Sequence, residues 1–257
     1  MPSITDEAVC IRHWDFSETS QTVSLFCREQ GMLRGLAKGA KREKGKFSGG
    51  IDLLTRGQIV ALIKPTSDLA TLTEWDLLET YWPARQSLPA HRAGMFMADM
   101  LFRMVTDHDP HPALYDALVA QLGTLGTPAA CDAAVLRFEW ALLQETGYRP
   151  ELNHDAETGQ PMNLTTNTLA YSARHGGVVA DTGAPDRWRV RRETIDCLRE
   201  LNGTSATDGE LPDAAPVTIR RAARLLAFHL RALQNEEPPT MRWVFPDERN
   251  EPVSHGT

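Results

Sequence analysis

The sequence predicts an α+β protein in which a small β-barrel precedes a mostly helical domain. Five runs with the alternating pattern of short strands fall within the first eighty residues. The pattern changes near Tyr81-Trp82-Pro83, and beyond this point apolar residues recur at helical spacing. A chain of 257 residues is long enough for two domains that each bury a core. We therefore expect a barrel over residues 1–80 and a helical domain over residues 81–257.

The barrel is expected to contain five strands separated by turn residues such as Gly31. The expected strands are Ala8–Trp14, Thr22–Arg28, Met32–Ala37, Gln58–Lys64 and Leu69–Thr73. Short strands that follow one another without intervening helices favour a barrel or a sandwich over a parallel sheet. Five strands in the first eighty residues match the size of an OB-fold, a small barrel whose loops commonly bind ligands.

The second domain is expected to contain five helices. They are Ala90–Thr106, Ala113–Leu122, Ala129–Thr146, Arg191–Leu201 and Val217–Leu233. The third of these has the clearest ends, because Pro128 stands near its first turn and Gly147 follows its last residue. Its wide apolar face predicts a helix at the centre of the core.

An irregular small lobe is expected over residues 148–187, which lack periodicity and are rich in Gly, Asn and Thr. It has room for one β-hairpin, formed by Thr168–Ala173 and Gly177–Ala180. The tail beyond Pro246 is polar, and we expect it to be frayed.

The composition is that of a globular protein outside the membrane. Apolar residues make up 42% of the chain and charged residues 24%, and no stretch approaches the roughly 20 apolar residues of a membrane span. The first residues lack the basic-then-apolar pattern of a signal peptide, so a cytoplasmic protein is expected. The four cysteines are Cys10, Cys27, Cys131 and Cys197. None forms a C-x-x-C pair, so we expect buried, reduced thiols and no metal or other cofactor.

Charge is distributed unevenly along the chain. Residues 1–64 hold ten basic and seven acidic residues, a net charge of +3, although the whole chain carries −7. The remainder therefore carries −10, with 17 basic and 27 acidic residues. All five lysines of the chain fall in the first 64 residues. This asymmetry indicates one surface suited to a polyanion.

The most informative segment runs from Arg34 to Phe47. It carries six basic residues and a single acidic one, and the basic residues are Arg34, Lys38, Lys41, Arg42, Lys44 and Lys46. Basic side chains release counterions from phosphates when they bind a nucleic acid. Binding of single strands also requires aromatic faces on which bases stack. Phe47 is the nearest aromatic residue, and Trp14 and Phe16 are further candidates.

Other interpretations of the charged segments stay open at this point. The basic segment could be an ordinary solvated loop, or part of an OB-type module that binds RNA. His108, Asp109 and His111 resemble a hydrolase metal motif, as in a nuclease, but Pro110 and Pro112 predict an inter-helix loop there. Two arginine clusters, at residues 187–192 and 220–224, could meet DNA or an acidic partner, although solvated helix faces are the simpler reading.

The order of several motifs resembles that of bacterial RecO proteins. Members of that family share a Glu-Ser/Thr tract, a Phe-Thr/Cys strand end and a run of the form Arg-x-x-Ala-Lys-Gly-Ala. Trp14–Ser20, Leu25–Gly31 and Arg34–Lys41 match these three features in turn. Leu69–Leu72 is similar to the last barrel strand of the family, and Leu136–Tyr148 to its central helix.

The resemblance implies a non-catalytic recombination mediator with an amino-terminal OB-fold and a carboxy-terminal helical domain. It implies binding of single- and double-stranded DNA, annealing of complementary strands, and contact with the acidic, Phe-ended tail of single-stranded DNA-binding protein. Cooperation with RecR in loading RecA, in the nucleoid, is also implied. Carried over to this sequence, the six basic residues and Phe47 would contact DNA, and Arg137 would pair with a carboxylate of the tail.

One departure from the family concerns the small lobe. Many RecO proteins carry two cysteine pairs there, which form a four-thiolate zinc site. The corresponding segments of this chain contain no cysteine, so the lobe is expected to be a degenerate zinc-ribbon that packing holds together without metal. A metal bound by His154, Asp155, His175 and Asp181 is the less favoured alternative.

Overall fold

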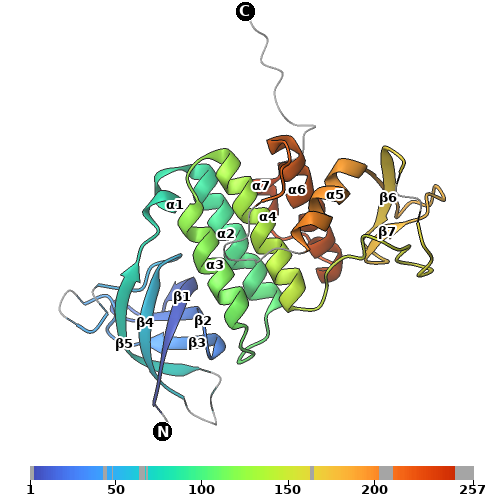
Figure 1. The fold of residues 1–257 in the computed structure, drawn as a ribbon. Coiled ribbons are helices and arrows are strands. Elements are labelled where there is room, and N and C mark those ends of the chain that lie inside the picture. The colour runs from blue at the N-terminus through green and yellow to red at the C-terminus, as the bar shows by residue number, and fades with distance from the viewer. Residues whose placement is uncertain are drawn as a thin grey trace, which may run out of the picture.

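The computed structural model describes residues 3–42, 45–47, 49–63, 67, 69–162, 165–202 and 211–246. A β-barrel stands at one end, a bundle of helices occupies the middle, and a small β-lobe projects at the other end (Figure 1). The expected tail beyond Pro246 lies outside the described residues. None of the helices in these ranges combines the length and apolar character that a membrane crossing requires.

The barrel closes in the order β1-β2-β3-β5-β4, which confirms the predicted five-stranded OB-type barrel. Its strands are β1 (Ser3–Asp15), β2 (Gln21–Cys27), β3 (Gly31–Ala37), β4 (Arg56–Leu62) and β5 (Ala70–Glu79). Neighbouring strands are antiparallel except for β3 and β5, whose parallel pairing closes the barrel. Observed strands extend beyond the predicted ones mainly at the start of β1 and the end of β5.

The middle of strand β1 is buried on both of its faces. Ala8 and Cys10 point into the barrel core, whereas Val9 and Ile11 pack against the helical domain. Gly31, in the turn before β3, has a φ of +66°, and a Cβ there would lie 2.2 Å from the backbone oxygen of Asp109. Only glycine satisfies both conditions, so this turn brings the barrel into backbone contact with the loop after the second helix.

The helical domain is built around one central helix, as predicted. Its helices are α1 (Trp82–Gln86), α2 (Leu88–Met104), α3 (Pro112–Thr124), α4 (Pro128–Glu145), α5 (Arg192–Leu201), α6 (Pro216–Gln234) and α7 (Met241–Val244). Helix α4 packs against α2, α3 and α6. The hydroxyls of Ser87 and Thr127 accept the backbone N–H groups that open α2 and α4, which is why these helices begin where they do.

A buried carboxylate fixes the barrel against the helices. Asp99 of α2, only 7% exposed, accepts hydrogen bonds from Arg12 of β1 at 2.7 Å and from Arg103 at 3.1 Å. Its second oxygen accepts from the hydroxyl of Thr240 at 2.8 Å. The Arg12 guanidinium also lies 3.7 Å from the ring centroid of Phe102. These contacts join three parts of the chain that are far apart in sequence, so the orientation of the barrel is defined.

The small lobe contains a three-stranded sheet in the order β7-β6-β8. Strands β6 (Thr168–Ser172) and β7 (Gly177–Val179) form the predicted hairpin, and β8 (Trp188–Arg191) was not predicted. All four cysteines are buried and free, as expected. Burial raises the pKa of the Cys10 and Cys27 thiols well above the ordinary value, so these thiols act as small apolar groups.

Candidate nucleic-acid interface

The basic segment after β3 is anchored beside the loop that joins β1 and β2. The backbone N–H of Lys41 donates to the carbonyl of Thr19 at 3.0 Å. The N–H of Gly39 donates to the hydroxyl of Ser20 at 3.1 Å. These two hydrogen bonds hold the backbone at Gly39 and Lys41 next to Thr19 and Ser20, in the loop that follows Trp14.

Strand register places an aromatic side chain between two groups of cations. Trp14 is paired with Thr22, and Thr22 with Leu36, so these three residues form one row across the outer face of β1, β2 and β3. The neighbouring row runs from Arg12 to Arg34. Rows on one face of a sheet are about 7 Å apart. Trp14 therefore lies between the arginine row on one side and the cations beyond the end of β3 on the other.

The side chains of this surface are accessible. Trp14 is 49% exposed and Phe16 65% exposed, and both are among the most exposed large apolar residues of the described chain. Lys38 and Arg42 are exposed, and Lys41 is partly exposed. We call Trp14, Phe16, Lys38, Lys41 and Arg42 the barrel face. It combines cations with aromatic rings, which is the combination that single-strand binding requires.

The remaining cations of the predicted set do not all join the barrel face. Arg34 points toward the helical domain, where it lies 3.2 Å from a carboxylate oxygen of Asp107. Lys46 forms an ion pair with Glu74 of β5, and its carbonyl accepts the backbone N–H of Trp75 at 2.9 Å. Lys44 lies outside the described residues. Basic residues that are close in sequence therefore face different parts of the structure. Arg34 faces the helical domain, Lys46 faces strand β5, and Lys38, Lys41 and Arg42 belong to the barrel face.

The expectation that Phe47 stacks on bases is wrong. Its side chain is 5% exposed and belongs to the barrel core, where it packs with residues such as Ile51 and Leu72. An apolar residue within a charged loop closes one end of the barrel instead of facing solvent. The exposed rings of Trp14 and Phe16 are the aromatic groups that this surface offers.

Carboxylates hold several of the cations in the free protein. Lys41 Nζ lies 2.5 Å from Asp15 Oδ1, and Glu74 and Asp107 pair with Lys46 and Arg34. These pairs are largely exposed, so each contributes little to stability. They position the cations, and a phosphate that approaches must compete with them.

Arg137 lies in the middle of α4 and is partly exposed, whereas the residues before and after it in sequence, Leu136 and Phe138, are buried. Burial lowers the pKa of the Arg137 guanidinium from its ordinary value. A partly exposed guanidinium can meet a carboxylate, but the predicted contact with a peptide stays a prediction.

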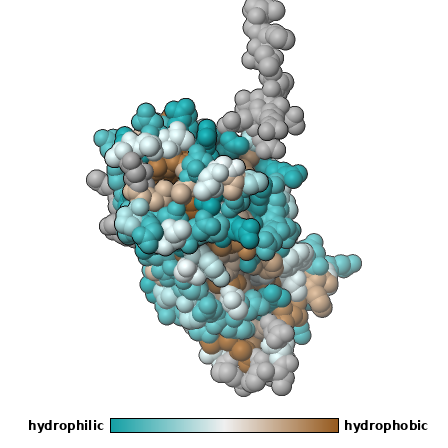
Figure 2. All heavy atoms as spheres, turned by 90° about the vertical axis from the view of Figure 1, so that its right-hand side faces the viewer, coloured by the Kyte–Doolittle hydropathy of each residue, from teal (hydrophilic) through white to brown (hydrophobic). Residues whose placement is uncertain are grey.

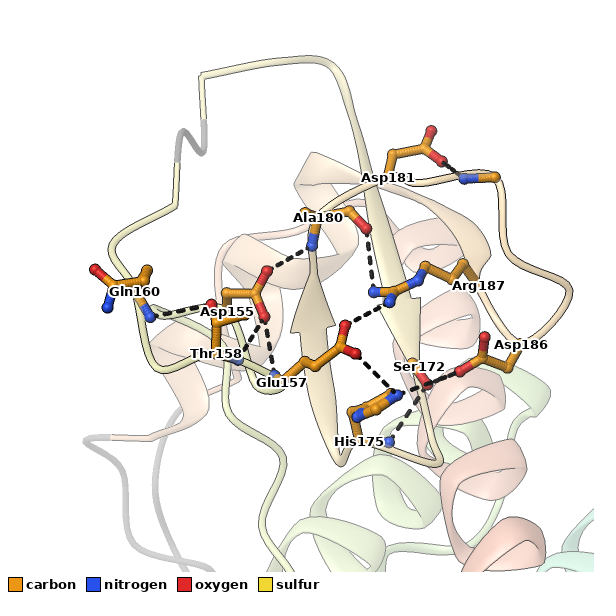
Figure 3. Close-up of polar contacts among 11 residues, drawn as sticks. Asp155, Glu157, Thr158, Gln160, Ser172, His175, Ala180, Asp181, Asp186 and Arg187 are labelled. Atoms are coloured by element: carbon orange, nitrogen blue, oxygen red, sulfur yellow. Dashed lines mark hydrogen bonds and ion pairs between the residues drawn. The ribbon is translucent and has the colours of Figure 1, made fainter.

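The lobe residues do not fit a zinc site. The Asp155 carboxylate accepts the backbone N–H groups of Glu157, Thr158 and Ala180 at 2.8 to 3.0 Å (Figure 3). Burial works against the charged form, but these donors outweigh it and lower the pKa of Asp155. Its oxygens are thus committed to the backbone. No group of three or more His, Cys, Asp or Glu side chains in the described part of the chain is arranged to hold a metal ion.

An arginine connects the segments of this lobe. Arg187, whose side chain is 6% exposed, donates to the carbonyl of Ala180 at 3.1 Å and lies 2.5 Å from Glu157 (Figure 3). His175 lies between Glu157 and Asp186, at 3.9 and 3.7 Å. A polar network therefore holds the lobe in addition to the expected packing.

The segment that resembles a hydrolase motif, His108 to His111, lies against the barrel. The N–H of His108 donates to the carbonyl of Met32 at 3.0 Å, and Asp109 is in contact with the Gly31 turn. His111 Nε2 lies 3.3 Å from Asp109. The segment joins the barrel to the helical domain, in agreement with the loop that its prolines predict.

Two family models together match nearly the whole chain. The model described as "Recombination protein O N terminal" matches residues 1–81, and the model described as "Recombination protein O C terminal" matches residues 85–242.

Curated relatives agree with these matches. A protein of Rhodopirellula baltica named "DNA repair protein RecO" is 34% identical over 215 residues, which cover 82% of this chain and 77% of the relative. Proteins with the same name from Anaeromyxobacter dehalogenans and Myxococcus xanthus are 28% and 24% identical, over 86% and 90% of this chain and 87% and 93% of each relative. The chain therefore belongs to the recombination protein O (RecO) family.

Proposed function

We propose that this chain is a non-enzymatic DNA-binding protein that mediates recombination during DNA repair. It binds single- and double-stranded DNA through the barrel face and anneals complementary strands. The observation that carries the proposal is the placement of the exposed Trp14 ring between the Arg34 row and the cations at Lys38, Lys41 and Arg42. Relatives named for DNA repair support the biological setting.

The mechanism is physical, since it makes and breaks no covalent bond. Two strands that approach each other repel through their phosphates, and a compact group of cations screens that repulsion. Stacking on Trp14 and Phe16 would hold the bases of one strand with their edges free to pair. Both effects lower the free energy of bringing complementary strands together.

Partners belong to the same proposal. A mediator must displace the protein that coats single strands, so it needs a contact with that coat. We propose that Arg137 and its apolar neighbours on α4 receive the acidic tail of single-stranded DNA-binding protein. Cooperation with RecR to load RecA, on DNA in the nucleoid, completes the proposed role.

Salt dependence tests the proposal directly. With about three phosphate contacts on a single strand, one for each cation of the barrel face, a plot of log K against log salt should have a slope of about −2. The measurement is fluorescence anisotropy of a labelled oligonucleotide at several salt concentrations, with annealing of complementary strands followed in parallel. A slope near zero, or annealing no faster than without protein, would exclude the proposed function.

Substitution of Trp14 by Leu should weaken single-strand binding by about tenfold, because stacking of one base contributes roughly 1–3 kcal/mol. The slope against salt should stay unchanged, since no cation is lost. Thr22→Ala, a change in the same row of the barrel face that removes no ring, is the matched control and should leave the affinity as it is. An unaltered affinity in Trp14→Leu would show that the ring is not a stacking platform.

A further inference from the structure

A groove of about 470 Å³ lies between β8 and α6, far from the barrel face. Apolar side chains, among them Trp188 and Phe228, line it together with arginines. The arginines are Arg189, Arg191, Arg221, Arg224 and Arg231. Figure 2 looks onto this side of the molecule and shows apolar surface recessed among hydrophilic surface. We call this feature the arginine groove.

The arginine groove is positively charged although the domain as a whole is acidic. Of the described residues that line it, none is acidic. Among the described residues, carboxylates approach these arginines from outside the groove. Asp181 lies 3.4 Å from Arg189, and Glu237 lies 3.0 Å from Arg231. Glu193 lies 3.3 Å from Arg221 and 3.7 Å from Arg191. Glu237 is shared with Arg242 as well. Five arginines line the groove, and none of its described lining residues is acidic, which favours an anionic occupant.

The arginine groove also contains aromatic rings beside its arginines. The rings of Trp188 and Phe228 meet edge to face at 5.8 Å, and Tyr171 stacks on Trp188 at 6.1 Å and holds it in place. The guanidinium groups of Arg231 and Arg224 lie 5.1 and 5.6 Å from the Phe228 centroid. Nucleic-acid bases stack on aromatic rings and on guanidinium planes alike.

We propose that the arginine groove binds a second segment of single-stranded DNA, with phosphates on the arginines and bases against Trp188 and Phe228. The α6 residues that line it run from Arg221 to Arg231, which corresponds to about 15 Å along the helix. A DNA strand carries a phosphate at every nucleotide and can engage several of these arginines in succession. An acidic polypeptide would need a run of carboxylates to do so and makes less use of the flat rings, so DNA is the favoured occupant.

This proposal rests on the proposed function, because it assumes a chain that acts on DNA. The barrel and the β6–β8 lobe stand at opposite ends of the molecule (Figure 1). One chain would therefore hold two separate DNA segments, one at each end, with the helical domain between them.

Binding stoichiometry tests the proposal in the full-length protein. The probe is an oligothymidylate of about ten nucleotides, within the roughly 4–16 nucleotides that small single-strand sites cover. Two oligonucleotides are expected per chain. Arg189→Glu with Arg191→Glu, which changes two exposed side chains at the groove, should leave one. Lys38→Glu with Lys41→Glu on the barrel face should also leave one, and all four changes together should leave none.

A photo-crosslinking measurement supports the assignment independently of affinity. An oligonucleotide with 5-iodouracil should crosslink to peptides that contain Trp188 or Phe228, and this crosslink should disappear in Arg189→Glu/Arg191→Glu. Arg149→Glu with Arg174→Glu, two exposed arginines outside the groove, is the matched control and should retain two oligonucleotides per chain.

The outcomes separate the two proposals. Two oligonucleotides retained in Arg189→Glu/Arg191→Glu would overturn the arginine groove and leave the barrel face intact. Two retained in Lys38→Glu/Lys41→Glu would instead overturn the barrel face. If wild type binds one oligonucleotide while a Glu-rich peptide binds wild type but not Arg189→Glu/Arg191→Glu, the groove is a peptide site and the assignment to DNA is wrong.

Discussion

Reversing the charge of Lys38 and Lys41 to Glu is expected to weaken binding of a single strand at the barrel face by about 100-fold in dilute salt, and to abolish annealing. Each lysine that faces a phosphate releases counterions when DNA binds, and each glutamate in its place repels the phosphate. Both positions lie beyond the end of β3 and carry no core side chain, so the fold should stay intact. Anisotropy titration with a labelled oligonucleotide measures the affinity, and circular dichroism checks the fold.

Two further variants make this prediction specific. Asp15→Asn removes the carboxylate 2.5 Å from Lys41, frees that cation, and should strengthen binding severalfold, the opposite direction. Arg149→Glu with Arg174→Glu alters the net charge by the same amount at exposed positions away from the barrel face and should have little effect. Annealing that persists in Lys38→Glu/Lys41→Glu would show that other cations carry the function.

Most of the fold follows from local patterns in the sequence. The alternation in β1 and β2 and the Ser and Thr caps with following prolines at α2 and α4 define elements without reference to the rest of the chain. The elements that prediction missed are short: α1 and α7 have five and four residues, and β8 has four. Strand β8 alternates Trp188 and Val190 with arginines, and it exists because β6 pairs with it.

The candidate site was only partly predictable, because charge density in a segment does not determine which way its side chains point. The density of basic residues in the segment was enough to predict that Lys38 and Lys41 belong to the candidate site. Arg34 is on the same segment, but its partner Asp107 belongs to a loop of the helical domain. Phe47 was misassigned because a ring in a charged loop can close the barrel core or face solvent, and only packing decides. The central place of Trp14 depends on strand register and on a bulge in β1 between Cys10 and Arg12.

A buried carboxyl group in the central helix leads to the second prediction. Glu139 of α4 has no exposed surface, and neither of its oxygens has a hydrogen-bond partner among the described residues. It stands four residues from both Val135 and Leu143, on the apolar side of the helix. Burial raises the pKa of Glu139 well above the ordinary 4.5, so the folded protein binds this proton more tightly than the unfolded chain does.

Substitution of Glu139 by Met is expected to stabilise the protein, and more so as the pH rises. Above pH 4.5 the unfolded chain loses the proton while the folded chain retains it. Stability of the natural protein should therefore fall by about 1.4 kcal/mol per pH unit until the folded-state pKa is reached, and Met removes this dependence. Removal of an unpaired buried polar group stabilises a protein by roughly 1–3 kcal/mol, which corresponds to a rise of about 2–12 °C in Tm, and the pH-dependent difference adds to this gain.

Thermal unfolding of the two proteins between pH 5 and 8 measures this difference. Because every other titrating group is shared, the difference between the two curves isolates Glu139. Glu200→Met, at an exposed position of α5, is the matched control and should show no such slope. A difference that stays constant with pH, or a less stable Glu139→Met, would mean that the carboxyl group is hydrogen-bonded or hydrated in solution.

A buried acid without partners cannot be explained by stability, since an apolar residue of the same size would pack there at lower cost. The slope would thus establish that α4, the helix on which we propose that Arg137 contacts a peptide carboxylate, carries a destabilising residue at its centre.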